Sequence, residues 1–239
     1  MVDYEALMEL IKNTRSIRRF RPEPIPDEYV DKIIEAGRWA PSAGNSQPWE
    51  FIVVKKQELK DSIVEIIMEQ NVVSAKMELT REPEQRFHGQ AGPPERLYYR
   101  DAPVFIIVCG DPRTKDAYPL NIFLQRGETM FLSSLANAFL YMHMAATALG
   151  LGSQWVSSTG NPFAQSLIKE LLGIPRELVL YDMLAVGYPA AEPTPRFMRA
   201  KEEMIHYDYY DQTKFRTDEG VRDFLRRNKA WLTARTRRG

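Results

Sequence analysis

The stretch at residues 40–51, Ala-Pro-Ser-Ala-Gly-Asn-Ser-Gln-Pro-Trp-Glu-Phe, lies between two segments of different periodicity. Before it, the residues from Asp27 onward carry apolar side chains at helical spacing, and after it residues 51–54 form the apolar run Phe-Ile-Val-Val. Its small and polar residues stand between Pro41 and Pro48, which is typical of a loop that offers backbone and side-chain amides to a ligand. The sequence therefore predicts a helix, a binding loop and a strand in this order.

A second polar cluster precedes this loop and contains Arg15, Ser16 and Arg18. Guanidinium groups bind phosphate through paired hydrogen bonds, and a serine hydroxyl adds a further donor. An isolated Arg-x-x-Arg is typical of a solvated surface pair. Together with the loop, however, the cluster indicates a site for a phosphate-bearing cofactor.

The order of these motifs resembles the nitroreductase family of FMN-dependent oxidoreductases: Arg-Ser-Ile-Arg, a helix, then Pro-Ser-Ala-Gly-Asn-Ser-Gln-Pro-Trp. The likeness covers most of the chain and is weakest over residues 68–128. It implies a nitroreductase-like α+β fold in a single domain over residues 1–239, with a central mixed or antiparallel sheet of four to five strands covered by helices. It also implies an interwoven homodimer, in which residues 196–239 extend over the partner subunit.

The resemblance also implies which residues bind the flavin. One arginine of the cluster would lie near the phosphate and one near the pyrimidine edge, while the loop at 41–47 would wrap the ribityl chain and ring from the neighbouring subunit. The loop at 156–159 matches the position that faces flavin N5, and a basic residue near the C-terminus would contact the phosphate. The implied cofactor-binding residues are Arg15, Ser16, Arg18, Pro41, Ser42, Ala43, Gly44, Asn45, Gln47, Val156, Ser157, Ser158, Thr159, Arg196 and Arg199.

Two features of this assignment have alternatives. Ser157 and Ser158 are also suited to satisfying a turn or capping the helix that follows. Many family members carry two consecutive arginines before the serine, whereas this chain has Thr14 at the first of these positions. If the missing arginine normally binds the phosphate, Arg199, or otherwise Arg196, takes a larger share of it.

The activity implied by the resemblance is hydride transfer from NADH or NADPH through flavin N5 to an electron-poor acceptor, in a ping-pong cycle. Small nitroaromatics, quinones and activated alkenes are the candidate acceptors, and no side chain is expected to act as an acid–base catalyst. Residues 155–159 and 186–189 also resemble the iodotyrosine deiodinase branch. A flavin-dependent reductive dehalogenase is therefore an alternative, and an FMN-binding or storage protein without turnover is another.

Residues 69–101 lose the periodic pattern and contain a polar, proline-broken stretch. We expect a lid or an excursion over a partner subunit, in which Phe87, Tyr98 and Tyr99 are candidates to face a substrate. A plain surface loop is the alternative.

Charge and cysteine content exclude several classes of partner. Lys plus Arg and Asp plus Glu number 32 each, so no global field favours nucleic acid or an anionic membrane. Cys109, the single cysteine, lies in an apolar run and is expected to behave as a small buried hydrophobe, which leaves no disulfide within the chain. With no signal-peptide pattern at the start, we expect a cytoplasmic protein.

An uncharged stretch over residues 129–153 is long enough to cross a bilayer, which takes about 20 apolar residues. It contains Ser134, Asn137 and His143, so we predict a helix at 129–149 that is buried in the core or in a dimer interface. The three histidines lie far apart in the sequence without cysteine partners, so no metal site is expected.

Overall fold

The computed structural model describes residues 3–82, 86, 96–191 and 196–238, with side chains described as far as Asn228. The chain divides into two compact units, residues 1–72 with 94–193 and residues 73–93 with 194–239. The first unit carries the sheet and most of the predicted binding residues. The second carries Arg196 and Arg199, and each unit is described separately below.

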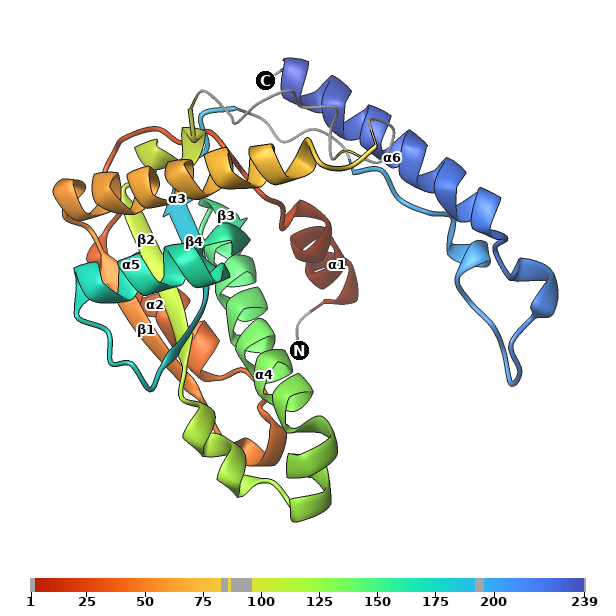
Figure 1. The fold of residues 1–239 in the computed structure, drawn as a ribbon, viewed down its shortest axis with the longest axis horizontal. Helices are drawn as coiled ribbons and strands as arrows, with labels where there is room; N and C mark the ends of the chain where they lie inside the picture. Colours follow the sequence, from red (N-terminus) through yellow and green to blue (C-terminus); the bar gives the residue numbers. More distant parts are fainter. Residues whose placement is uncertain (1–2, 83–85, 87–95, 192–195, 239) are drawn as a thin grey trace. The chain divides into compact units, whose positions relative to one another are not determined.

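The first unit alternates helices, short 3-10 helices and strands. In chain order they are α1 (Tyr4–Asn13), α2 (Asp27–Arg38), η1 (Ala43–Asn45), β1 (Trp49–Val54), α3 (Gln57–Glu78, which continues into the second unit), η4 (Tyr98–Asp101), β2 (Val104–Gly110), η5 (Pro112–Ala117), α4 (Leu120–Ala148), β3 (Gly152–Val156), η6 (Ser157–Gly160), α5 (Pro162–Leu172) and β4 (Val179–Gly187). Figure 1 shows the path of the chain through them.

The four strands form one antiparallel sheet in the order β1-β2-β4-β3. β1 and β2 pair without interruption from Trp49 opposite Gly110 to Val54 opposite Phe105. The pairing of β2 with β4 contains an irregularity between Val108 and Cys109. The predicted α+β fold with a helix-covered antiparallel sheet is confirmed, and the interwoven homodimer stays a prediction.

The side chains of β2 alternate between two apolar cores, one on each face of the sheet. Phe105 and Cys109 pack in the core covered by α3 and α5, whereas Ile106 and Val108 pack in the core covered by α2 and α4 (Figure 1). Every residue of β2 is buried, because both faces are covered. Burial raises the pKa of the Cys109 thiol to about 12, so the predicted behaviour as a buried hydrophobe is confirmed.

The helix predicted over residues 129–149 begins earlier, at Leu120. The polar residues around Arg126 interrupt the apolar pattern in this first part. They lie exposed on the helix and are therefore compatible with it. Phe131 and Phe139 are fully buried, whereas Leu132 and Leu140 are exposed. Burial in the core is therefore confirmed for one face of the helix, and burial of the other face in a dimer interface stays a prediction.

No helix among the described residues combines the length and the apolar character that crossing a membrane requires. α4 ends in a glycine cap. Gly150 has a φ of +73°, its N–H donates to Thr147 O, and the Leu151 N–H donates to Ala146 O at 2.9 Å.

Part of the region predicted as a lid or excursion is helical. α3 continues to Glu78, beyond the point at 69 where the sequence pattern fades. Residues 83–85 and 87–95 lie outside the described residues, and with them the candidate substrate-facing residue Phe87. The predicted lid stays a prediction, but its two tyrosines belong to η4.

The second unit contains η7 (Lys201–Glu203), η8 (Gln212–Lys214) and α6 (Asp218–Arg238). The rings of Phe197 and Phe224 stack with centroids 5.8 Å apart, and the Arg216 guanidinium lies 5.5 Å from the Phe224 ring. These contacts hold the segment around residue 197 against α6.

Candidate cofactor-binding site

The arginine cluster directly follows α1, whose last turn is closed by Thr14. The Thr14 side chain is buried, and its hydroxyl donates to Leu10 O at 2.8 Å. Arg15 Nε donates to Lys12 O at 3.0 Å, so this side chain also contacts the end of α1. The threonine that stands where many family members have an arginine is thus part of a helix end.

The segment that follows lies against the first residues of β3. Ser16 forms a parallel bridge with Ser153, and the Ile17 N–H donates to Ser153 O at 2.9 Å. The Ser153 hydroxyl is in turn 2.5 Å from Nδ1 of the buried His143 on α4. A β-carbon at Gly152 would lie 2.9 Å from the Ile17 side chain, so the segment approaches β3 closely only because residue 152 is a glycine.

At its other end, β3 leads into η6, which contains the predicted N5-facing residues. Ser157 is exposed, Ser158 is half-buried, and the buried Thr159 donates its hydroxyl to Val156 O at 2.9 Å. The cap of α5 is Asn161, whose Oδ1 accepts from the Phe163 N–H at 3.0 Å. The alternative that Ser157 or Ser158 caps this helix is therefore wrong, because Asn161 fills the cap position.

The loop at 41–47 is fixed on α4 by two side chains of that helix. The Ala43 N–H donates to Ser134 Oγ at 3.1 Å, and Asn137 Nδ2 donates to Pro41 O at 3.0 Å. Within the loop, the Gln47 N–H donates to Ser42 Oγ at 3.0 Å. The loop thus has a defined conformation rather than being a loose connection.

Three residues of this loop have left-handed backbone conformations: Gly44 with φ of 59°, Asn45 with φ of 50° and Gln47 with φ of 44°. Glycine adopts such angles freely and asparagine tolerates them, but glutamine does so at a cost of roughly 1–2 kcal/mol. Strained backbone of this kind is concentrated at ligand-binding sites. The strain at Gln47 is a second reason, besides composition, to place a ligand here.

The structure brings the predicted residues together in two groups rather than one. The arginine segment contacts α4 through Ser153 at His143, whereas the loop at 41–47 contacts the same helix at Ser134. At the helical rise of 1.5 Å per residue, these two points of α4 are about 14 Å apart. Arg196 and Arg199 belong to the second unit, where Arg199 Nε lies 3.4 Å from Glu203 Oε2.

Sequence reasoning missed a buried carboxylate next to η6. Asp182 of β4 accepts from Trp155 Nε1 at 2.5 Å, and the Trp155 ring packs on Phe139 with centroids 4.1 Å apart. Burial raises the pKa of Asp182 to about 6, against the lowering effect of the indole hydrogen bond. The sequence feature that could have identified Asp182 is an aspartate in the middle of an apolar strand.

The donor groups of these segments fit a phosphate-bearing flavin. A phosphate requires cationic or N–H donors, a ribityl chain requires hydroxyl and amide partners, and Arg18, Ser16, Asn45 and Gln47 supply these chemical types. Among the described residues, no group of three or more His, Cys, Asp or Glu side chains is arranged to hold a metal ion.

Comparison with known proteins gives consistent results. A family model described as the nitroreductase family matches residues 11–188. An Archaeoglobus fulgidus protein, provisionally named NADH dehydrogenase/NAD(P)H nitroreductase, is 31% identical over 79% of this chain and 88% of its own length. Iodotyrosine deiodinase 1 of Rattus norvegicus is 28% identical over 81% of this chain and 65% of its own length. The crystal structure of a Bacteroides fragilis nitroreductase with bound FMN superposes with a TM-score of 0.64, at 24% identity over 87% of this chain and 100% of that one.

Proposed function

The chain belongs to the nitroreductase family of oxidoreductases, and we propose on this premise that it is an FMN-dependent enzyme that oxidises NADH or NADPH and reduces an electron-poor acceptor. Nitroaromatics, quinones and activated alkenes are the acceptors proposed. One structural observation carries the proposal: the Ser16–Ser153 pairing joins the arginine segment to the strand that leads into Ser157 and Ser158. Two motifs that are far apart in the sequence thus belong to one edge of the sheet.

When bound, FMN supplies the redox chemistry, accepting hydride from the nicotinamide and passing electrons to the acceptor. The residues of the chain bind and orient it. Arg18 places a positive charge that stabilises negative charge at the pyrimidine edge, and Ser16 adds a hydroxyl donor. The η6 residues Ser157 and Ser158 follow the end of β3 and would face the reactive centre of the bound ring.

We propose a homodimer in which the loop at 41–47 of one subunit completes the site of the other. Two observations support this arrangement. The loop and the arginine segment of one chain contact α4 at points about 14 Å apart, so within one chain they belong to separate parts of that helix. In addition, α4 exposes the apolar side chains of Leu132, Leu140 and Tyr141, which a second copy would cover.

The test is an absorption spectrum of the purified protein after incubation with FMN and removal of the excess, followed by anaerobic addition of NADH and then NADPH. We expect a bound-flavin spectrum that bleaches with one of the two nucleotides. A protein that takes up no FMN would overturn the proposal. A flavin that is bound but not reduced by either nucleotide would instead establish the storage alternative.

The likeness to an iodotyrosine deiodinase keeps reductive dehalogenation as a second candidate. Anaerobic incubation of the FMN-loaded protein with a halotyrosine and dithionite separates the two. We expect no release of halide in this assay. In a separate assay, NAD(P)H should reduce a nitroaromatic or a quinone. Stoichiometric release of halide and no turnover of the other acceptors would favour the dehalogenase.

A further inference from the structure

The hydroxyl of Tyr99 is a buried polar group outside the predicted cofactor-binding residues. The Tyr99 side chain is 5% exposed, and its ring meets Phe105 edge to face with centroids 6.1 Å apart. In the part of the chain that the structure describes, two buried side-chain polar atoms have no hydrogen-bond partner: Tyr99 Oη and Gln154 Oε1. Buried polar groups are almost always paired, so each such atom needs an explanation.

The surroundings of Tyr99 point to η6. Burial raises the pKa of Tyr99, and the Ser158 hydroxyl lies close enough to oppose that shift without completing a hydrogen bond of ordinary geometry. Gln154 lies on the same face of the sheet, since Gln154 and Phe105 both pair with Ala185 from opposite sides. The two unpartnered atoms therefore face the side of the sheet on which Tyr99 approaches Ser158.

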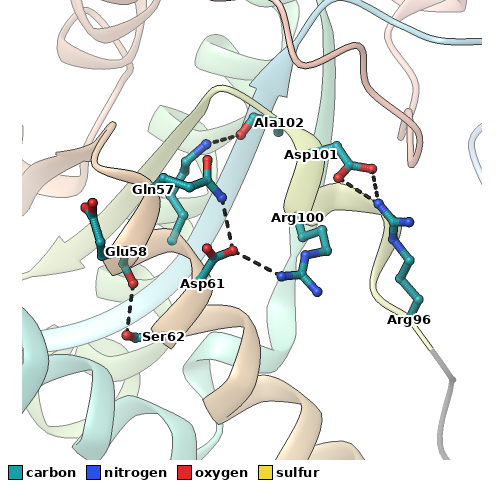
Figure 2. A network of polar contacts seen from close by, with 9 residues as sticks. Gln57, Glu58, Asp61, Ser62, Arg96, Arg100, Asp101 and Ala102 are labelled. Carbon is teal, nitrogen blue, oxygen red and sulfur yellow. Dashed lines mark hydrogen bonds and ion pairs between the residues drawn. The ribbon is translucent and has the colours of Figure 1, made fainter.

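Polar contacts join η4, the segment that carries Tyr99, to α3 (Figure 2). Lys60 Nζ donates to Ala102 O at 2.8 Å and is itself buried. Asp61 Oδ1 accepts from Arg100 at 3.2 Å and from Gln57 Nε2 at 3.0 Å. Both contacts lie on the C-terminal side of Tyr99, so α3 fixes the part of η4 that directly follows this residue.

A second set of contacts ties η4 to the arginine segment. Arg96 binds both carboxylate oxygens of Asp101, at 2.7 and 2.6 Å (Figure 2). The guanidinium groups of Arg19 and Arg96 lie 4.6 and 6.0 Å from the ring of Tyr98. Tyr98 thus contacts the residue next to Arg18, while Tyr99 approaches Ser158, so η4 links both segments of the proposed site.

We propose that Tyr99 is a positioning residue that orients the Ser158 hydroxyl for the flavin, a role that rests on the proposed function. A phenylalanine would fill the same space without burying an unpaired hydroxyl, so the hydroxyl adds nothing to apolar packing. We therefore expect the Tyr99 hydroxyl to act on its polar neighbour, Ser158. Tyr99 Oη completes its hydrogen bond when Ser158 takes the orientation required by the bound cofactor.

The test compares Tyr99→Phe, Ser158→Ala and the double variant by three measurements: FMN dissociation constant, flavin reduction potential, and urea unfolding without FMN. Tyr99→Phe is expected to unfold at the same or a higher urea concentration than wild type, because it loses only an unpaired hydroxyl. FMN should nevertheless bind about threefold to tenfold more weakly, the range for one hydrogen bond. The potential should shift in the direction seen with Ser158→Ala, and the double variant should be no weaker than Ser158→Ala alone.

Tyr29→Phe is the matched control, because Tyr29 is a half-buried tyrosine of α2 on the opposite face of the sheet. Its FMN affinity and potential should equal those of wild type. If wild type binds FMN and Tyr99→Phe keeps the same affinity and potential, the positioning role is refuted while the proposed function stands. Additive effects of Tyr99→Phe and Ser158→Ala would also refute it, because Tyr99 would then act on its own. A wild-type protein that binds no FMN overturns the proposed function and the role with it.

Discussion

The indole N–H of Trp155 and the carboxylate of Asp182 form a 2.5 Å hydrogen bond between β3 and β4. The carboxylate is 8% exposed and borders η6, because a β-carbon at Gly160 would lie 3.3 Å from Asp182 Oδ1. Tyr181, its neighbour in β4, also has a raised pKa, through burial and through the charge of Asp182. The inner strand β4 therefore holds a carboxyl group that is partly protonated in the folded state near pH 6.

Asp182→Asn should change the pH dependence of stability. The folded pKa of about 6 lies above the ordinary aspartate value of 3.8, so the folded state binds the proton more tightly than the unfolded state. This group stabilises the fold below pH 4, and the contribution is lost as the pH rises from about 4 to about 6. Urea unfolding between pH 4 and pH 7 should show wild type losing about 2 kcal/mol more than the asparagine variant over this window. Parallel pH profiles for the two proteins would refute the burial of this charge.

Arg18→Ala should weaken FMN binding about tenfold, because a hydrogen bond to a charged group contributes more than a neutral one. The dissociation constant is measured by quenching of flavin fluorescence. Arg38→Ala serves as the control, since Arg38 is an exposed arginine of α2 that pairs with Glu35 at 2.7 Å. Equal affinities of the two variants would show that the contribution of Arg18 is not specific and would remove it from the site.

Ser134→Ala should release the loop at 41–47. Its hydroxyl accepts from the Ala43 N–H, and alanine leaves that donor without its partner, at a cost of about 1–2 kcal/mol. Amide hydrogen exchange at Ala43 should accelerate, and urea unfolding should occur at lower concentration. Ser133→Ala on the exposed side of the same helix should change neither. Unchanged exchange at Ala43 would contradict the seating of the loop on α4.

Gly160→Ala should destabilise the fold by about 3 kcal/mol, because a β-carbon would lie 2.5 Å from the backbone oxygen of Tyr181. A backbone atom in a strand cannot move aside as a flexible side chain does. Gly220→Ala in the first turn of α6 provides the comparison, since its nearest neighbour is 3.4 Å away and alanine favours a helix by up to about 1 kcal/mol. Thermal unfolding of both variants measures the difference, and a Gly160→Ala protein as stable as wild type would contradict the close packing of η6 on β4.

The elements with a strong apolar pattern could be predicted from the sequence. Residues 104–109 are apolar without alternation, which is how a strand covered on both faces appears, and this strand is β2. The beginning of α4 was missed, because exposed polar residues such as Arg126 belong to a helix as readily as to a loop. Helix propensity and the local pattern do not distinguish a helix from a loop in such a segment, because tertiary packing decides between them.

The candidate site was predictable in composition but not in arrangement. The loop at 41–47 and the arginine cluster were both identified from their donor groups, yet the pairing of Ser16 with Ser153 depends on how distant segments meet. The same holds for Tyr98 and Tyr99, adjacent residues of which one is exposed and the other buried. No local signal separates two consecutive tyrosines in a polar stretch, and Asp182 acquires its significance only from its hydrogen bond with Trp155 of β3.

α4 sets the spacing of the proposed site. Ser134 binds the loop at 41–47, and His143 binds Ser153, which pairs with the arginine segment. The number of helical residues between Ser134 and His143 therefore sets the distance between these two contacts. One residue inserted between these two positions would turn one anchor by about 100° relative to the other and move it by about 1.5 Å. Related chains are therefore free to vary in the length of their loops, whereas the number of residues in this part of α4 is expected to stay constant.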